Sequence, residues 1–245
     1  MEKIIPHIEM MPVEFPAYSI IVIASILTGV IFASLIMYRA GVRRNTIIYT
    51  ALLTFVCIMV CGLSFSIITS AGHKTIGFTG AGGAIGLLTG SFISLLIHCD
   101  HETETICSWI ITAPLMYGLS KTACHTVGCC HGICYSHTGY IIYTTEGIPR
   151  FPVQLTETVI FLLIFMVGLV LFIGVKKPFV AAIVVEILCI IAKFGTDYLR
   201  ESHYESGHIL SSNQISAIVC GVMAVTLTLI SNRLIKKKKL VSDHK

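Results

Sequence analysis

The side chains best able to do chemistry are gathered in one stretch of the chain, Ser120–Gly132, which reads S-K-T-A-C-H-T-V-G-C-C-H-G. It holds one lysine, two histidines and three cysteines, and Cys134 and His137 follow at once. Such a set could bind zinc, form a disulfide outside the cytoplasm, or use a cysteine nucleophile with a neighbouring histidine as base. Because the spacing C-x4-C-C-x3-C matches no paired C-x2-C zinc pattern, a disulfide among these four cysteines, or a purely structural cluster, is favoured over a metal.

A second set of ionisable residues falls inside apolar segments, where a charged side chain is costly unless it is paired or hydrated. Lys193 and Asp197 lie four residues apart and therefore share a helix face, so they could form an internal ion pair. Lys121 ends another apolar segment at a similar depth. Two lysines from different helices at one membrane level favour a bound anion instead, such as a lipid phosphate.

The composition predicts an integral membrane protein. The 245 residues are 55% hydrophobic and only 12% charged, whereas charged residues make up about 25% of a soluble domain. Eleven of the seventeen Lys and Arg residues lie in three connecting or terminal segments beside the apolar blocks. The net charge of +4 therefore gives no indication of nucleic-acid binding, and we expect a lipid bilayer as the surrounding partner.

The apolar segments predict an all-α fold, a polytopic membrane helix bundle with seven transmembrane helices. The first segment is too long for the apolar core of a signal peptide and follows no basic region, which predicts an uncleaved helix. Because positive charges concentrate on the cytoplasmic side, the basic groups predict an outer N-terminus and a cytoplasmic C-terminus. The predicted helices cover residues 18–38, 47–70, 76–97, 105–124, 155–174, 179–199 and 210–231.

No internal repeat or low-complexity linker divides the chain, so residues 1–245 are expected to form a single integral membrane domain. Residues 121–154 are expected to form a small head on the outer face, and residues 232–245 a basic cytoplasmic tail. Polar residues open several helices at the outer face, which favours a site for an amphiphilic, anionic ligand entered from the bilayer. These residues are Tyr18, Gln154, Glu157, Asn213 and Gln214.

Three glycines in the third predicted helix, Gly82, Gly86 and Gly90, recur every four residues. Small residues on one helix face let a second helix approach closely. Tight helix packing is therefore favoured. The alternative is a close approach of the backbone to a bound lipid or substrate.

Motifs along nearly the whole chain, in the same order, resemble those of the prolipoprotein diacylglyceryl transferase family. They are G-G-A-I-G (82–86), S-K-T-A-C-H-T-V-G-C-C-H-G (120–132), P-V-Q-L-T-E (152–157), A-K-F-G-T-D-Y-L-R (192–200) and N-Q-I-S (213–216). The family signature is close to G-R-x-G-N-F-x-N-G-E-x-x-G, and a variant branch reads G-R-x-G-C-F-x-x-G-C-C-Y-G. This chain resembles the variant branch, which it matches at Cys124, Gly128, Cys129, Cys130 and Gly132.

The resemblance implies a transferase in the bacterial plasma membrane, with its active site facing the outer leaflet. Members of the family transfer a diacylglyceryl group from phosphatidylglycerol to the lipobox cysteine thiol of a prelipoprotein. They form a thioether and release glycerol phosphate, with no cofactor. The implied partners are therefore phosphatidylglycerol, or a related anionic phospholipid, and the signal-peptide lipobox of a prelipoprotein.

The resemblance also implies roles for individual residues. Lys121 and Lys193 would hold the phosphate, while Tyr18 and Asp197 would position the substrate or other side chains; these four are the implied catalytic positions. No metal ligand is implied. The implied substrate-binding positions are Gly82, Gly83, Cys124, Cys130, Gly132, Gln154, Glu157, Arg200 and Gln214.

The chain departs from the family at positions that matter for the chemistry. Both arginines of the family are lysines here, Lys121 and Lys193, which keep the charge but lose the two-pronged grip of a guanidinium on a phosphate. The family histidine aligns with Ala81 and the signature glutamate with Cys130, so the base is unassigned. Three histidines could replace it: His73, His125 and His131.

Two functions from different classes follow. The first is the lipid transferase, and the alternative is a non-catalytic relative that binds a lipid or lipopeptide. A small-solute transporter would need polar residues through the inner half of the bundle, where the sequence supplies few besides Glu186.

Overall fold

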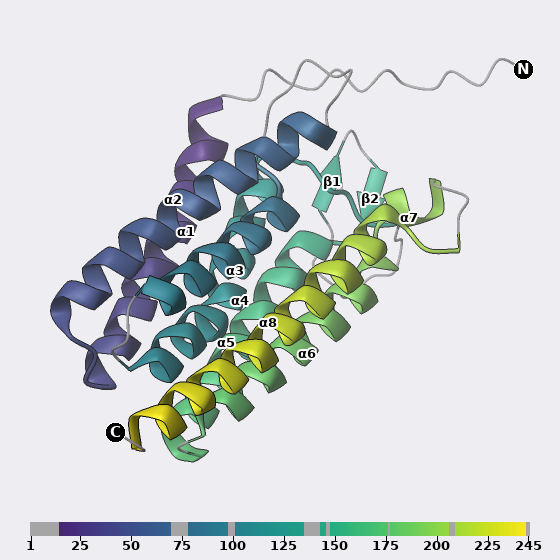
Figure 1. The fold of residues 1–245 in the computed structure, drawn as a ribbon. Coiled ribbons are helices and arrows are strands. Elements are labelled where there is room, and N and C mark those ends of the chain that lie inside the picture. The colour runs from purple at the N-terminus through teal and green to yellow at the C-terminus, as the bar shows by residue number, and fades with distance from the viewer. Residues whose placement is uncertain are drawn as a thin grey trace, which may run out of the picture.

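The structure, a computed structural model, describes residues 15–69, 78–97, 101–134, 143–145, 148–175, 177–205 and 209–243. These residues form a bundle of long helices with a small antiparallel sheet at one end (Figure 1). The sheet pairs β1 (Tyr143–Thr145) with β2 (Ile148–Arg150), and a short helix α7 (Glu201–Glu205) lies at the same end. The long helices are α1 (Phe15–Arg39), α2 (Arg44–Thr69), α3 (Gly80–Ile97), α4 (Glu102–Thr126), α5 (Val153–Val175), α6 (Pro178–Asp197) and α8 (Ser212–Asp243).

The predicted all-α fold is confirmed, and each predicted apolar segment coincides with one long helix. Six of these helices are long and apolar enough to cross a membrane; α4 is not among them. At 25 residues α4 is long enough, but Glu102, Glu104 and several hydroxyl side chains lower its hydropathy. A helix that other helices surround needs no lipid-facing apolar surface, so α4 can carry polar groups that the outer helices cannot.

Helix α4 is the centre of the bundle, in contact with α1, α3, α5, α6 and α8. One of its faces, with Ile110 and Ile111, packs in a core cluster with α5 and α6. Its opposite face, with Trp109 and Met116, packs in a second cluster with α1 and α2. Since both faces are buried, α4 fixes the position of α5 and α6 relative to α1 and α2.

The glycines of α3 lie against α2, which confirms the prediction of tight helix packing. A β-carbon added at Gly86 would lie 2.3 Å from the carbonyl oxygen of Cys57, and one added at Gly82 would lie 2.5 Å from that of Cys61. At Gly90 it would meet Cα of Thr54 at 2.7 Å. The two backbones can therefore approach this closely only because these positions carry no side chain.

The helix bounds differ from the expected ones at two of the connecting and terminal segments. Lys121 and Cys124 belong to the last turns of α4, and Gln154 belongs to α5, so the segment between the two helices is shorter than the predicted head of residues 121–154. At the other end of the chain, α8 continues as a helix to Asp243, through the segment predicted as a tail.

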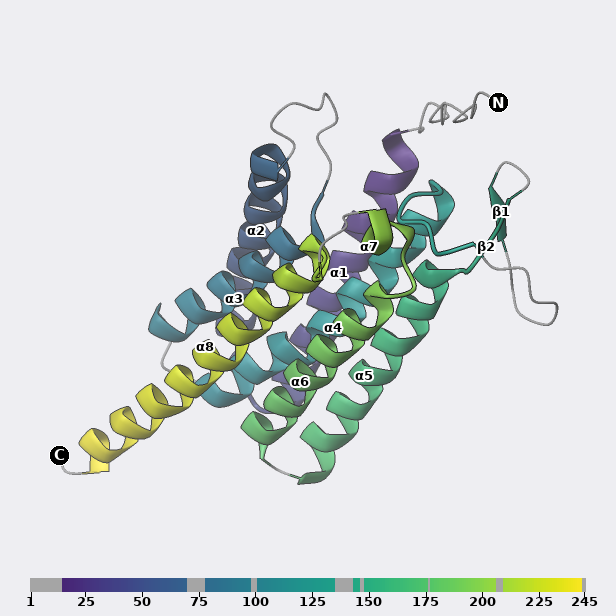
Figure 2. The ribbon, with the colours of Figure 1, turned by 90° about the vertical axis from the view of Figure 1, so that its right-hand side faces the viewer.

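The bundle has two distinct ends. The start of α1, the end of α4, the start of α5, the end of α6 and the start of α8 share the end that carries β1, β2 and α7, and the C-terminus lies at the opposite end (Figure 2). Several exposed basic residues lie at this opposite end or close to it: Arg39, Arg43, Arg44, Lys177, Lys236 and Lys237.

Candidate functional site

A single buried carboxylate, that of Glu157, holds three cationic side chains together. Glu157 lies in the second turn of α5 and is fully buried. Its Oε2 atom is 3.3 Å from Nζ of Lys121 and 2.6 Å from a guanidinium nitrogen of Arg200, and its Oε1 atom is 3.1 Å from Nζ of Lys193. Thr196 donates a further hydrogen bond to Oε1 at 2.9 Å. We call Glu157, Lys121, Lys193 and Arg200 the cation cluster.

The cation cluster carries more positive than negative charge. Three cations meet one carboxylate, and no second carboxylate pairs with them in the described part of the chain. Both lysines also lie over the ring of Tyr117, with Nζ at 4.8 Å and 5.4 Å from its centre, a contact that stabilises a cation. Two positive charges therefore remain to attract an anion.

The three cations come from elements that meet at one end of the bundle. Lys121 is near the end of α4, Lys193 is near the end of α6, and Arg200 follows α6 directly. Burial tends to lower the pKa of Arg200, but the neighbouring carboxylate of Glu157 raises it above its ordinary value, so the guanidinium stays charged. The side chain of Lys193 is 19% exposed, against 10% for Lys121 and 5% for Arg200, so Lys193 is the most accessible cation of the cluster.

Three cysteine sulfurs meet beside the cation cluster, because of the way in which α4 ends. Gly128 has a positive φ of 66°, and the amides of Gly128 and Cys129 donate to the carbonyls of His125 at 3.3 Å and Cys124 at 3.0 Å. This pair of bonds is a Schellman motif, which brings the residues at its two ends together. The Sγ atoms of Cys124, Cys129 and Cys130 all lie within 4.8 Å of one another.

The loop after α4 is held by buried contacts on both sides. Gln154, fully buried, donates from Nε2 to the carbonyl of Cys129 at 2.7 Å. The amide of Ile133 donates to the carbonyl of Leu199 at 3.0 Å. A β-carbon at Gly132 would lie 2.1 Å from the carbonyl oxygen of Phe151, so glycine is required there. The predicted positions Gln154 and Gly132 thus fix the backbone that presents the cysteines.

The predicted disulfide is not formed: the structure has Cys124, Cys129, Cys130 and Cys134 as free thiols. The thiols of Cys124 and Cys129 donate hydrogen bonds to Cys130 and lower its pKa below the ordinary value. Burial opposes this effect, and Lys121 and Arg200 add to it. Cys130 is therefore the sulfur of the three that is best stabilised as a thiolate.

Asp197 is held in a separate group of buried side chains. Its Oδ2 atom accepts from Ser211 Oγ and lies 3.1 Å from Nδ1 of His203. Gln214, fully buried, accepts from the amide of Ser211 at 3.1 Å. The alternative of an ion pair between Lys193 and Asp197 is not seen in the structure, because the ammonium group of Lys193 lies 3.1 Å from Oε1 of Glu157 in α5. Asp197 and Gln214 instead join the end of α6 to the start of α8.

Of the remaining predicted residues, Tyr18 lies beside the cation cluster, whereas Gly82 and Gly83 lie in helix contacts. Tyr18 donates to the carbonyl of Phe78 at 3.4 Å and acts electrostatically on Lys121 and on the three cysteines, so it borders the site. Gly82 packs against α2, and the space beside Gly83 is filled by the ring of Phe78. These contacts give the two glycines a packing role, and their predicted substrate contact stays a prediction. His73 lies outside the described residues.

Sequence reasoning missed three contributors to this end of the bundle. Tyr117 lies under both lysines, Thr196 bonds Glu157, and His203 bonds Asp197. A helical spacing of four residues between Tyr117 and Lys121 was a usable signal. The other two contacts join different elements, and no local pattern predicts them.

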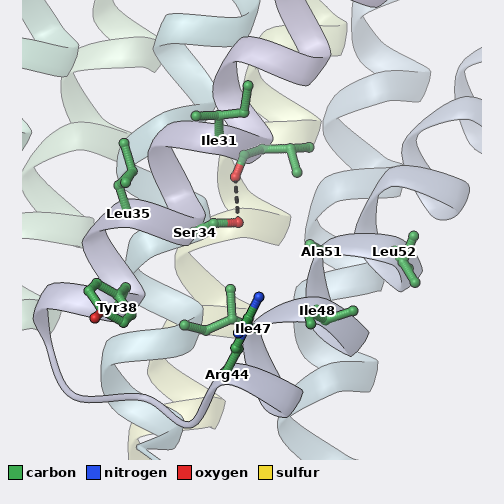
Figure 3. Close-up of a pocket in the computed structure, with 10 residues that line it drawn as sticks. Ile31, Ser34, Leu35, Tyr38, Arg44, Ile47, Ile48, Ala51 and Leu52 are labelled. Atoms are coloured by element: carbon green, nitrogen blue, oxygen red, sulfur yellow. Dashed lines mark hydrogen bonds between the residues drawn. The ribbon is translucent and has the colours of Figure 1, made fainter.

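A groove of about 690 Å³ lies between α1 and α2, away from the site (Figure 3). Its walls are mostly exposed apolar side chains, including Ile31, Leu35 and Leu52. Ser34, drawn with its hydrogen bond in Figure 3, donates to its own helix at Val30, 2.8 Å away. The groove contains none of the predicted site residues, so it does not belong to the cation cluster.

A comparison with known protein families and with curated proteins finds no match to this chain.

Proposed function

We propose that this chain is a membrane lipid transferase of the prolipoprotein diacylglyceryl transferase type. It would transfer a diacylglyceryl group from phosphatidylglycerol, or a related anionic phospholipid, to the lipobox cysteine thiol of a prelipoprotein. The observation that supports this most is the cation cluster, in which Lys121 from α4, Lys193 from α6 and Arg200 from the segment after α6 share one buried carboxylate. Such an arrangement offers a phosphate two unneutralised positive charges.

The positive charge of the cation cluster can stabilise the negative charge that develops on the leaving phosphate in this reaction. The sulfur–carbon bond forms as the carbon–oxygen bond to the phosphate breaks, and the electron pair stays on the leaving oxygen. The phosphodiester carries one negative charge and the departing glycerol phosphate gains a second. Fixed cations therefore stabilise the transition state and product more than the bound lipid, which is the condition for catalysis.

The proposed setting is the bacterial plasma membrane, with the end that carries the cation cluster facing outward. In this proposal α4 crosses the bilayer together with the six apolar helices, and the N-terminus lies outside. The basic residues at the opposite end of the bundle favour this orientation, since positive charge concentrates on the cytoplasmic side. The lysines would then lie near the outer phospholipid headgroups.

The test is mass spectrometry of a lipobox peptide incubated with purified protein and phosphatidylglycerol. Wild-type protein should add a diacylglyceryl mass by a thioether bond. Lys121→Ala should lower the rate about 100-fold or more, the usual cost of removing one group that stabilises developing charge. Lys121→Arg should keep or raise the rate, because the guanidinium restores the charge and adds a two-pronged grip.

Lys177→Ala is the matched control, because Lys177 is exposed at the other end of the bundle. Its rate should equal that of the wild type. If correctly inserted wild-type protein forms no thioether product, the transferase proposal is wrong. Phosphatidylglycerol binding that Lys121→Ala weakens, in the absence of turnover, would instead support the non-catalytic lipid-binding alternative.

A further inference from the structure

We propose that Cys124, Cys129 and Cys130 bind one zinc ion and leave its fourth position open for the acceptor cysteine thiol. This inference rests on the proposed transferase function, because the acceptor of that reaction is a thiol. Catalytic zinc sites commonly combine three protein ligands with one position for water or substrate. The three cysteines are the group of potential metal ligands that the described residues bring together.

The sulfur atoms are already near the spacing that zinc requires. With zinc–sulfur bonds of about 2.3 Å, the ligands of a tetrahedral site lie about 3.8 Å apart. All three Sγ atoms here lie within 4.8 Å of one another, so rotations of the side chains are enough to close the site. Cys134 follows in the same loop but is not part of this group.

The backbone holds this arrangement in place. The Schellman motif fixes Cys124 against Cys129, and Gln154 fixes the carbonyl of Cys129. Cys130 has a φ of 61°, a left-handed conformation that a residue with a side chain adopts only where its surroundings hold it there. Such constraints, imposed before any ligand binds, are typical of a prepared site.

The choice of zinc follows from the ligands and from charge. Thiolates select soft or borderline ions such as zinc. Three thiolates and Zn²⁺ together carry one negative charge, and Lys121 and Arg200 act electrostatically on Cys130 from the cation cluster. One of the two excess positive charges there compensates the charge of the metal site, and the other remains for the phosphate.

Bound zinc would promote loss of the proton from the acceptor thiol, a step that otherwise needs a base. The position of the family histidine is Ala81 in this chain. A thiol that binds zinc loses its proton to solvent, and its sulfur remains the nucleophile that attacks the glycerol carbon. The carbon–oxygen bond then breaks and glycerol phosphate leaves with the electron pair, so no oxidation or reduction occurs. The neutral thioether product is a weaker ligand than the thiolate, which favours its release.

Metal content tests the ligand set without reference to activity. Purified protein in nanodiscs, loaded with zinc and passed over a desalting column, should hold one zinc ion per chain by elemental analysis. Cys124→Ser, Cys129→Ser and Cys130→Ser should each weaken zinc binding at least 10-fold, whereas Cys134→Ser should bind zinc as the wild type does. Zinc should also protect the three cysteines, but not Cys134, from alkylation.

Cobalt tests the open position. In protein loaded with Co²⁺, a lipobox peptide should raise the sulfur-to-cobalt charge-transfer absorbance by about one third, since a fourth thiolate joins three. The same peptide with serine in place of cysteine should leave the spectrum unchanged. No phospholipid is added, so the result does not depend on the transfer reaction.

The outcomes separate this inference from the proposed function. Wild-type protein without zinc, a Cys130→Ser variant that keeps it, or a spectrum that responds equally to both peptides overturns the zinc inference. Equal rates of thioether formation before and after zinc removal also overturn it, but leave the transferase intact. A cobalt response to the cysteine peptide alone, without any lipidated product, supports the thiol site and contradicts the transferase.

Discussion

The buried carboxylate of Glu157 stabilises three cationic side chains at once and is itself stabilised by them. Alone in a buried position, Glu157 would be costly, because its charge has left water. Lys121, Lys193 and Arg200 would in turn repel one another without it. Glu157 thus holds three mutually repelling cations together at the ends of α4 and α6, and an excess of positive charge remains for a ligand.

Removal of the charge of Glu157 should therefore destabilise the protein strongly. Glu157→Gln keeps the shape but leaves three buried cations uncompensated, and breaking a buried pair in this way costs roughly 3–5 kcal/mol. We expect a large fall in the thermal unfolding midpoint in detergent. Added phosphatidylglycerol should recover part of the loss, since its phosphate can take the place of the carboxylate.

Glu201→Gln provides the comparison, because Glu201 is 37% exposed where it pairs with Arg150. An exposed pair contributes about 0–1 kcal/mol, so this variant should melt close to the wild type. Similar midpoints for the two variants would contradict the central role assigned to Glu157.

At the scale of elements, the contact between α2 and α3 shows that the effect of a glycine-to-alanine substitution depends on where the glycine lies. Gly86 faces a backbone carbonyl of α2, with no room for a β-carbon. Gly174, near the end of α5, has no atom within 4 Å of such a carbon. The same substitution at the two positions thus isolates the packing contribution from helix propensity.

Gly86→Ala should force the two helices apart and cost about 1–3 kcal/mol, the usual range for an overpacked contact. Gly174→Ala should be neutral or slightly stabilising, because alanine favours the helix by up to about 1 kcal/mol over glycine. Denaturant-dependent unfolding in mixed micelles measures both. A Gly86→Ala protein as stable as Gly174→Ala would mean that α2 and α3 do not meet at the glycines.

For the molecule as a whole, the separation of charge between its ends predicts its orientation. Lys236 and Lys237 are exposed in the last turns of α8, and Cys134 is exposed at the end that carries the cation cluster. In intact spheroplasts an impermeant maleimide should label Cys134, while an impermeant amine reagent should leave Lys236 and Lys237 unmodified until the membrane is lysed. The inverse pattern would place the cation cluster on the cytoplasmic side and would contradict the proposed orientation.

The sequence by itself determined the helical fold of this protein, since long apolar segments have few other ways to satisfy their backbone hydrogen bonds. It also determined the glycine contact and the convergence of Lys121 and Lys193, which follow from helix periodicity and shared depth. Only the tertiary structure decided which charge meets which. Lys193 shares a helix face with Asp197 but pairs with Glu157, because the packing of α5 against α6 places the carboxylate of Glu157 beside its ammonium group. The grouping of three sulfurs likewise depends on how α4 ends, on Gly128 and on Cys130, which spacing patterns alone do not encode.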